Sequence, residues 1–161
     1  MFGFLFAITL GCASAAPFLN VTCSSGVHII VARGSNEAPG EGRIGSVTTL
    51  IKQAIPGSRS EAITYPATLN NYQSSETQGV AAMVQAIASY VRACPNGRFA
   101  LLGYSQGAQV IGDALGGGSF DTAAPIDAGL TTNCMCPSLA LSPNSSSDCG
   151  RAVCRSCSCR W

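Results

Sequence analysis

Three short apolar runs alternate along the chain with longer segments whose apolar residues recur at helical spacing. The runs lie at 26–32, 62–65 and 98–102, and a glycine or proline stands beside each of them. Continuous apolar runs of this length are typical of strands buried on both faces of a sheet. We therefore predict three strands of a parallel sheet.

Three amphipathic segments predict helices. Their apolar faces are Ile44, Val47, Leu50, Ile51 and Ile55 in the first, Val80, Met83, Val84, Ile87, Ala88 and Val91 in the second, and Ala108, Val110, Ile111, Ala114 and Leu115 in the third. Ser75 and Gln78 have the spacing of a capping box, so we expect the second helix to begin there and end near Cys94. Strands that alternate with helices in this way predict a parallel sheet with helices on both faces.

The third strand runs directly into Gly103-Tyr104-Ser105-Gln106-Gly107, and the third helix follows at once. This G-x-S-x-G pattern is typical of a nucleophile elbow, in which a serine lies on a strained turn between a strand and a helix. The glycines are needed because side chains at those positions would clash with neighbouring backbone. Strand, elbow and helix in this order favour a nucleophilic Ser105 over an ordinary glycine-rich turn.

Composition limits the partners and the compartment. Of 161 residues, 11% are charged and the formal net charge is +1, so we expect one domain and no nucleic-acid partner. Residues 1–16 have the layout of a secretory signal, with an apolar run at 2–11 and a small-residue cleavage site; neither that run nor any other is long enough to span a bilayer. Nine cysteines also indicate an oxidising compartment, so we predict a secreted protein without a membrane anchor.

Residues 23–127 resemble the cutinase and acetylxylan esterase family, carbohydrate esterase family five. The resemblance rests on the segments 27–35, 61–67, 75–94 and 103–108 and covers about two thirds of the chain. It implies a three-layer α/β-hydrolase fold of the cutinase type. It also implies a monomeric serine esterase that needs no cofactor or metal and acts on a plant cell-wall polymer, either acetylated xylan or cutin.

The same resemblance implies roles for five residues. Ser105 matches the nucleophile, and Ser35 and Gln106 match the positions that build the oxyanion hole. Cys23 and Cys94 match a disulfide that ties the start of the first strand to the end of the second helix. The loop at 38–42 and the pair Tyr65-Pro66 slightly favour an acetylxylan esterase over a cutinase.

The base and the acid of a catalytic triad have no match in the chain. In α/β-hydrolases they follow the nucleophile in the order Ser, Asp, His, but the single histidine here, His28, precedes Ser105. It stands near the amino end of the first strand. We therefore expect it to lie roughly 15 Å from Ser105, and we do not expect it to act as the base. Asp121, Asp127 and Asp148 remain as acids without a family match.

The end of the chain departs from the family. We expect a signal peptide at 1–16, a partial α/β domain at 17–130 and an irregular, cysteine-rich tail at 131–161, with no strand or helix after Thr132. Three interpretations stay open for the six tail cysteines: a small disulfide knot, a zinc site, or an out-of-frame or mis-spliced sequence that replaces the end of an esterase. We favour the last, which leaves the sheet incomplete and the third strand near an exposed edge.

Two functions of different classes follow. The first is a secreted carboxylic ester hydrolase that works through an acyl-enzyme on Ser105, with hydrolysis weak or absent because no downstream Asp and His are found. The second is a non-catalytic, secreted, cysteine-rich protein that keeps an esterase-like scaffold.

Overall fold

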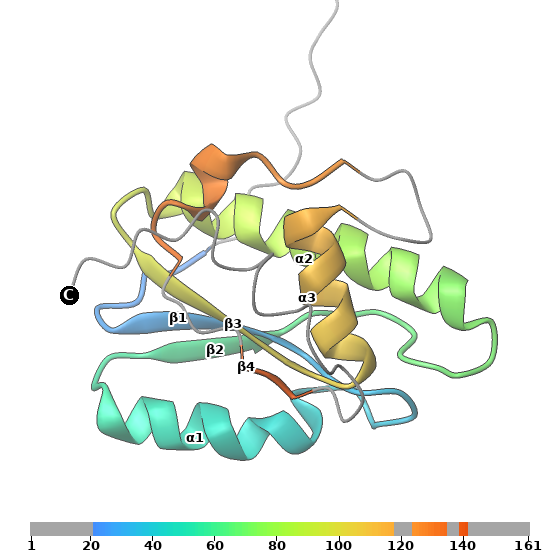
Figure 1. Cartoon of the computed structure of the whole chain (residues 1–161). Coiled ribbons are helices and arrows are strands. Elements are labelled where there is room, and N and C mark those ends of the chain that lie inside the picture. Colours follow the sequence, from blue (N-terminus) through green and yellow to red (C-terminus); the bar gives the residue numbers. More distant parts are fainter. Residues whose placement is uncertain (1–20, 118–123, 135–138, 142–161) are drawn as a thin grey trace, which may run out of the picture.

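The computed structural model describes residues 21–117, 124–134 and 139–141, which are built around a parallel sheet (Figure 1). The strands are β1 (Val27–Ala32), β2 (Arg59–Ala62), β3 (Arg98–Tyr104) and β4 (Leu139–Leu141), in the order β2-β1-β3-β4. Every pair of neighbouring strands is parallel. Their carboxyl ends therefore meet at one edge of the sheet, where catalytic groups gather in folds of this kind.

Helices cover both faces of the sheet. Helix α1 (Gly45–Ala54), which follows a 3-10 turn at Gly42–Ile44, lies on one face, and α2 (Tyr72–Ala93) and α3 (Gln106–Gly116) lie on the other (Figure 1). A second 3-10 helix spans Ala128–Thr131. These three layers confirm the predicted α/β-hydrolase class.

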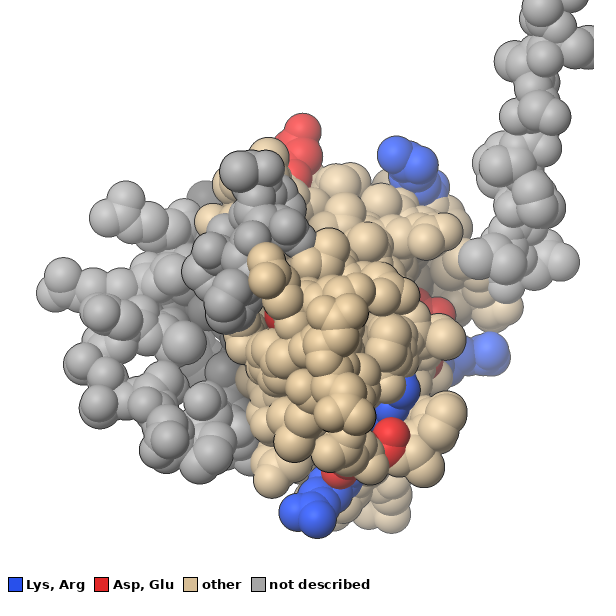
Figure 2. Space-filling model, turned by 90° about the vertical axis from the view of Figure 1, so that its right-hand side faces the viewer, with Lys and Arg blue, Asp and Glu red and all other residues tan. Residues whose placement is uncertain are grey.

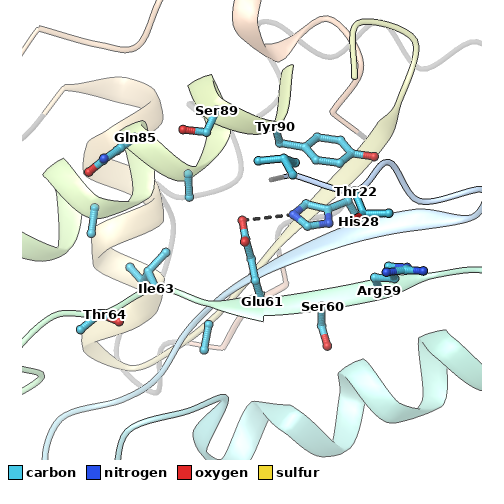
Figure 3. A pocket seen from close by; sticks show the side chains of 14 residues that line it. Thr22, His28, Arg59, Ser60, Glu61, Ile63, Thr64, Gln85, Ser89 and Tyr90 are labelled. Atoms are coloured by element: carbon cyan, nitrogen blue, oxygen red, sulfur yellow. Dashed lines mark ion pairs between the residues drawn. The ribbon is translucent and has the colours of Figure 1, made fainter. Parts of the chain in front are cut away.

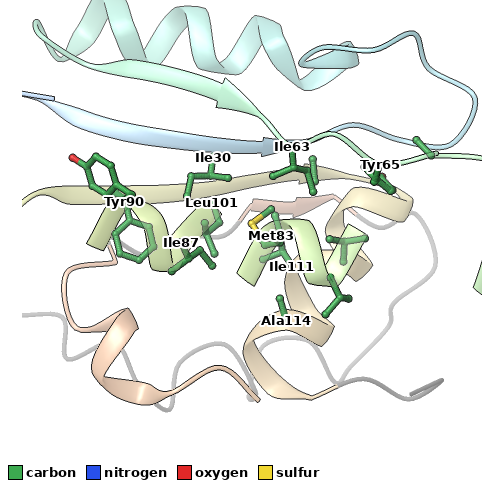
Figure 4. Packing of buried hydrophobic residues seen from close by; sticks show 14 of the residues in the cluster. Ile30, Ile63, Tyr65, Met83, Ile87, Tyr90, Leu101, Ile111 and Ala114 are labelled. Carbon is green, nitrogen blue, oxygen red and sulfur yellow. The ribbon is translucent and has the colours of Figure 1, made fainter. Parts of the chain in front are cut away.

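The core has one cluster on each side of the sheet. Ile30 and Leu101 lie opposite each other on β1 and β3 and pack against Met83 and Ile87 of α2 (Figure 4). A smaller cluster faces α1 and consists of Val27, Ile29, Val31, Ile44 and Leu102. Each fully buried aliphatic side chain contributes about 1.5–3 kcal/mol relative to an exposed one. Because helices cover both faces, all six residues of β1 are buried, as the continuous apolar run predicts.

The second strand lies earlier than its prediction at 62–65. β2 is Arg59–Ala62, an edge strand whose residues alternate between exposed and half-buried. Ile63 and Tyr65 are buried, but they follow the strand on the path to α2. Apolar residues of the predicted run are therefore buried, but a preceding polar segment forms the paired strand at this edge.

Two helical details also differ from the predictions. Helix α2 begins at Tyr72, after Asn71 in a left-handed conformation, so Ser75 is not its cap. The Ser75 hydroxyl instead accepts a hydrogen bond from the Thr68 N–H inside the fold. In α1, Leu50 is 64% exposed, because it lies roughly 120° around the helix from the centre of the buried face.

The expectation that no strand follows Thr132 is wrong. β4 (Leu139–Leu141) pairs in parallel with the end of β3, and an isolated bridge joins Phe99 to Cys134. The elbow strand β3 is therefore not an edge strand, and β4 supplies the neighbour that the sequence did not indicate. The predicted signal peptide and the tail cysteines after Cys134 lie outside the described residues.

One face of the molecule carries few charges. The face drawn in Figure 2 is mainly uncharged, with Lys, Arg, Asp and Glu scattered near its margins. Among the helices that the structure describes, none has the length and the apolar character needed to cross a bilayer.

Candidate active site

Ser105 occupies the turn between β3 and α3, at the carboxyl edge of the sheet. It is exposed, and its backbone has φ 53° and ψ −118°, a conformation that residues with side chains rarely adopt. Such strain costs of the order of 1–3 kcal/mol and persists only where the surrounding structure enforces it. The predicted order of strand, exposed serine and helix is confirmed.

The two glycines of the motif make this turn possible. A Cβ atom on Gly103 would lie 2.5 Å from the carbonyl oxygen of Gly107, and one on Gly107 would collide with the carbonyl of Ala32 at the end of β1. Both obstacles are backbone, so no side-chain movement could relieve them. Close contact between α3 and the sheet thus depends on glycine at both positions.

The structure brings Ser35 and Gln106 together beside this turn. Ser35 lies in the loop after β1, and Gln106 is the first residue of α3. The Ser35 hydroxyl donates a hydrogen bond to Oε1 of Gln106 over 3.1 Å. The Gln106 N–H belongs to the first turn of the helix, where N–H groups lack helical acceptors and the helix dipole favours negative charge. An oxyanion formed at Ser105 would be stabilised there.

The side chain of Gln106 has a positioning role that the sequence did not indicate. It is 1% exposed, and its Nε2 donates to the carbonyl oxygens of Thr68 and Tyr72, at 3.5 and 3.4 Å. These two acceptors orient the amide so that Oε1 faces Ser35. The Ser35 proton is thereby engaged by Oε1 of Gln106.

The loop that carries Ser35 is fastened at its base by Arg33. This buried guanidinium donates to the carbonyl oxygens of Tyr65 and Glu37, at 2.6 and 3.1 Å. The Tyr65 hydroxyl donates back to the carbonyl of Arg33 at 2.5 Å, and burial raises the pKa of Tyr65 to about 12. The Glu37 carboxylate accepts the N–H of Gly34. These hydrogen bonds tie the loop after β1 to the segment that follows β2.

His28 does not reach Ser105. It lies opposite Phe99 in the β1–β3 register, six residues before Ser105, which corresponds to about 20 Å along the strand. Its ring is buried and stacked on Tyr90. The interpretation of His28 as a strand residue is confirmed.

The candidate acids are not assembled at the described site either. The Asp127 carboxylate accepts the Gly129 N–H and caps the 3-10 helix at Ala128–Thr131. Asp121 and Asp148 lie outside the described residues. Within residues 21–117, 124–134 and 139–141, no group of three or more His, Cys, Asp or Glu side chains could hold a metal ion.

The predicted disulfide between Cys23 and Cys94 is present, with the two Cα atoms 5.6 Å apart. It joins the segment before β1 to the end of α2. It therefore braces the amino edge of the sheet, opposite the edge that carries Ser105.

Comparisons with known proteins agree with this architecture. A sequence model described as "Cutinase" matches residues 23–148. Cutinase 11 of Verticillium dahliae is 38% identical over 133 residues, which are 74% of this chain and 45% of that protein. Acetylxylan esterase 2 of Talaromyces purpureogenus is 38% identical over 99 residues, which are 57% of this chain and 42% of that protein.

Among solved structures, the catalytic core domain of acetyl xylan esterase from Trichoderma reesei superimposes with a TM-score of 0.65 at 36% identity. The match covers 70% of this chain and 61% of that one. Of Cutinase 11 and acetylxylan esterase 2, in contrast, this chain spans less than half the length.

Proposed function

We propose that this chain, which belongs to the cutinase family, acts on carboxylic esters through Ser105. The observation that carries the proposal is the exposed Ser105 on a strained elbow, beside the hydrogen-bonded pair Ser35 and Gln106. An exposed hydroxyl next to preorganised N–H donors is the arrangement that acyl transfer requires.

In the proposed reaction, Oγ of Ser105 attacks the acyl carbonyl and transfers its proton to a base. The oxyanion is stabilised by the N–H groups of Ser35 and Gln106 until the C–O bond to the alcohol breaks and the alcohol takes up the proton. Water then hydrolyses the acyl-enzyme by the same route. His28 is too distant to be the base, so we propose that these 161 residues alone turn over esters far more slowly than an intact triad would.

We propose a polysaccharide or polyester of the plant cell wall, acetylated xylan or cutin, as the source of the ester. The names of the relatives, acetylxylan esterase and cutinase, support this class of substrate. We further propose that the protein is secreted and monomeric. The Cys23–Cys94 disulfide supports secretion, since such bonds persist in oxidising compartments.

Hydrolysis of p-nitrophenyl acetate with and without added imidazole tests the proposal. Without imidazole, we expect only slow turnover, because oxyanion stabilisation and binding without a triad give roughly 10³–10⁴-fold acceleration over water. Imidazole supplies the missing base, and we expect it to raise the rate of hydrolysis roughly tenfold. A positioned base contributes about 10²–10⁴-fold, and a free base lacks that positioning. Ser105→Ala should abolish the increase.

Ser46→Ala is the matched control, because Ser46 is exposed on α1, which lies on the opposite face of the sheet from α2 and α3. It should respond to imidazole as the wild type does. Equal rates for wild type and Ser105→Ala at every imidazole concentration would rule out Ser105 as the nucleophile. Triad-level turnover without imidazole would show that a base is already present.

A further inference from the structure

The carboxylate of Glu37 lies inside the loop that follows β1 and carries Ser35. Its Oε2 accepts the backbone N–H of Gly34 at 2.6 Å, and its Oε1 accepts that of Arg43 at 3.0 Å. The Glu37 side chain is 14% exposed, so both hydrogen bonds are largely shielded from water. Hydrogen bonds from an N–H group to an ionised carboxylate are roughly twice as strong as those between neutral groups. A single side chain therefore joins the start of the loop to the 3-10 turn at its end.

Two features of the loop show how the carboxylate is held. Gly42 has φ 58°, and a Cβ atom there would collide with the Glu37 carboxylate, so glycine leaves the space that the carboxylate occupies. The Arg43 guanidinium also pairs with the carboxylate, with 3.6 Å between Nε and Oε1, but its side chain is 79% exposed. Exposed ion pairs contribute little to stability. The backbone N–H groups, more than the guanidinium, hold the carboxylate in place.

Glu37 also fixes the peptide bond that carries the Ser35 N–H. The backbone N–H of Glu37 donates to the carbonyl oxygen of Gly34 at 3.4 Å, so Glu37 binds both polar groups of Gly34. The Gly34 C=O and the Ser35 N–H belong to one planar trans peptide group and point in opposite directions. On the other side of Ser35, the Asn36 N–H donates to the carbonyl oxygen of Ala67 at 2.6 Å. The direction of the Ser35 N–H is therefore set largely by Glu37.

We propose that Glu37 is a positioning residue, which holds the Ser35 N–H in the direction of the acyl oxygen of a bound ester. The inference rests on the proposed function, which assigns an oxyanion to this N–H. A carboxylate near an oxyanion would slow hydrolysis through its charge alone, because like charges repel. Glu37→Gln should therefore speed the reaction if charge dominates and slow it if positioning does. We expect it to slow the reaction, because the glutamine NH₂ group can only donate and one of the two N–H contacts is lost.

NMR relaxation of the full chain measures this positioning without any ester. The order parameter of a backbone N–H is about 0.85 where the backbone is rigid and below about 0.6 where it is flexible. For the Ser35 N–H we expect the rigid value in the wild type and the flexible value in Glu37→Gln. Glu37→Asp keeps the charge but is one methylene shorter, so it should give the same loss and serves if Glu37→Gln fails to fold. A flexible N–H in the wild type, or a rigid one in either variant, would overturn the proposal.

Glu41 provides a matched control in the same loop. Its carboxylate accepts hydrogen bonds from the side-chain hydroxyls of Thr48 and Ser60, and so links the loop to α1 and β2. Glu41→Gln removes the same charge from the same loop without touching the Gly34 peptide group. The Ser35 order parameter should therefore stay at its wild-type value in this variant.

Glu61 provides a second control outside the loop. It projects from β2 toward His28, and the two side chains form an ion pair with 3.1 Å between Oε1 and Nε2 (Figure 3). Across β1, Glu61 is level with Leu101, which lies about 13 Å before Ser105 along β3. Glu61→Gln should leave the order parameter unchanged. A loss in either control as large as that in Glu37→Gln would show a general loosening of the fold and would contradict the proposal.

Ester hydrolysis tests whether the positioned N–H serves an oxyanion. In the imidazole assay, the rate that depends on Ser105 should fall about tenfold in Glu37→Gln, since losing an oxyanion donor outright costs about 10²–10³ in kcat and this variant only misaligns one. The thiono analogue of p-nitrophenyl acetate, which has C=S in place of C=O, should react equally with both proteins, because sulfur is a weak hydrogen-bond acceptor. The same change for both esters, or a faster reaction of the oxygen ester, would refute the positioning role.

The two readouts separate this proposal from the proposed function. Equal hydrolysis by the wild type and Ser105→Ala would refute the proposed function but leave the relaxation data untouched. Those data would then decide by themselves whether Glu37 positions the Ser35 N–H.

Discussion

Ser35 and Gln106, which are 71 positions apart in sequence, are joined by a side-chain hydrogen bond at the edge of the sheet that carries Ser105. The bond links the loop after β1 to the first residue of α3. Nε2 of the same glutamine also donates to the carbonyl oxygen of Thr68, which lies just before α2, and to that of Tyr72, the first residue of α2. One buried amide thus connects three separate segments around the candidate oxyanion hole.

The first prediction concerns this amide. Gln106→Leu keeps most of the side-chain volume but removes every hydrogen bond of the amide, so we expect the free energy of unfolding to fall by about 1–3 kcal/mol. Ser35→Ala removes only one of these bonds and should cost less, about 1 kcal/mol. Urea unfolding of the two variants and the wild type measures both. A Gln106→Leu variant as stable as the wild type would show that the amide does not hold the three segments together.

The second prediction compares two glycines of α3. A Cβ at Gly107 would collide with the carbonyl of Ala32, whereas one at Gly112 would meet nothing within 4 Å. Gly107→Ala should therefore destabilise the fold by more than about 3 kcal/mol, because helix and sheet must separate. Gly112→Ala should stabilise it by about 0.5–1 kcal/mol through helix propensity alone. Thermal unfolding followed by circular dichroism gives both values, and similar effects at the two positions would contradict the packing at the elbow.

The elbow could be predicted from sequence because its requirements are local. Gly103 packs against Gly107, and Gly107 packs against the end of β1, so a five-residue pattern between a strand and a helix is enough to predict the geometry. The buried strands β1 and β3 were predicted for a related reason. Helices cover both faces of each strand, and a continuous apolar sequence is typical of strands that are buried in this way.

What the sequence missed depends on contacts between distant segments. β2 is a polar edge strand and β4 has three residues, so neither has the apolar length that signals a strand. The partners of the Gln106 side chain come from segments 34 to 71 positions away, and no pattern near Gln106 indicates them. Likewise, His28 could be assigned to a strand, but its ion pair with Glu61 could not be predicted, because Glu61 lies two residues beyond Arg59, the residue opposite His28 in the β1–β2 register.

The third prediction concerns pH and Tyr65. Burial raises its pKa from 10.0 to about 12, and the neutral phenol donates to the carbonyl of Arg33. Between these two values the unfolded chain loses a proton that the folded chain keeps. The stabilisation from neutral Tyr65 is therefore fully present below pH 10 and is lost as the pH rises from 10 to 12. A shift of this size corresponds to about 2–3 kcal/mol.

Tyr65→Phe isolates this contribution, because it keeps the ring and removes the ionisable hydroxyl. The variant should be less stable than the wild type near neutral pH, by about 1 kcal/mol for the lost hydrogen bond to Arg33. Its stability should then fall less steeply between pH 10 and 12, so that the two unfolding curves converge or cross. Urea unfolding at several pH values measures this, with phenolate absorbance as a check on how many tyrosines have ionised. Parallel curves across that interval would mean that Tyr65 ionises as readily in the folded chain as in the unfolded one, and that the Arg33–Tyr65 contact does not shield it from solvent.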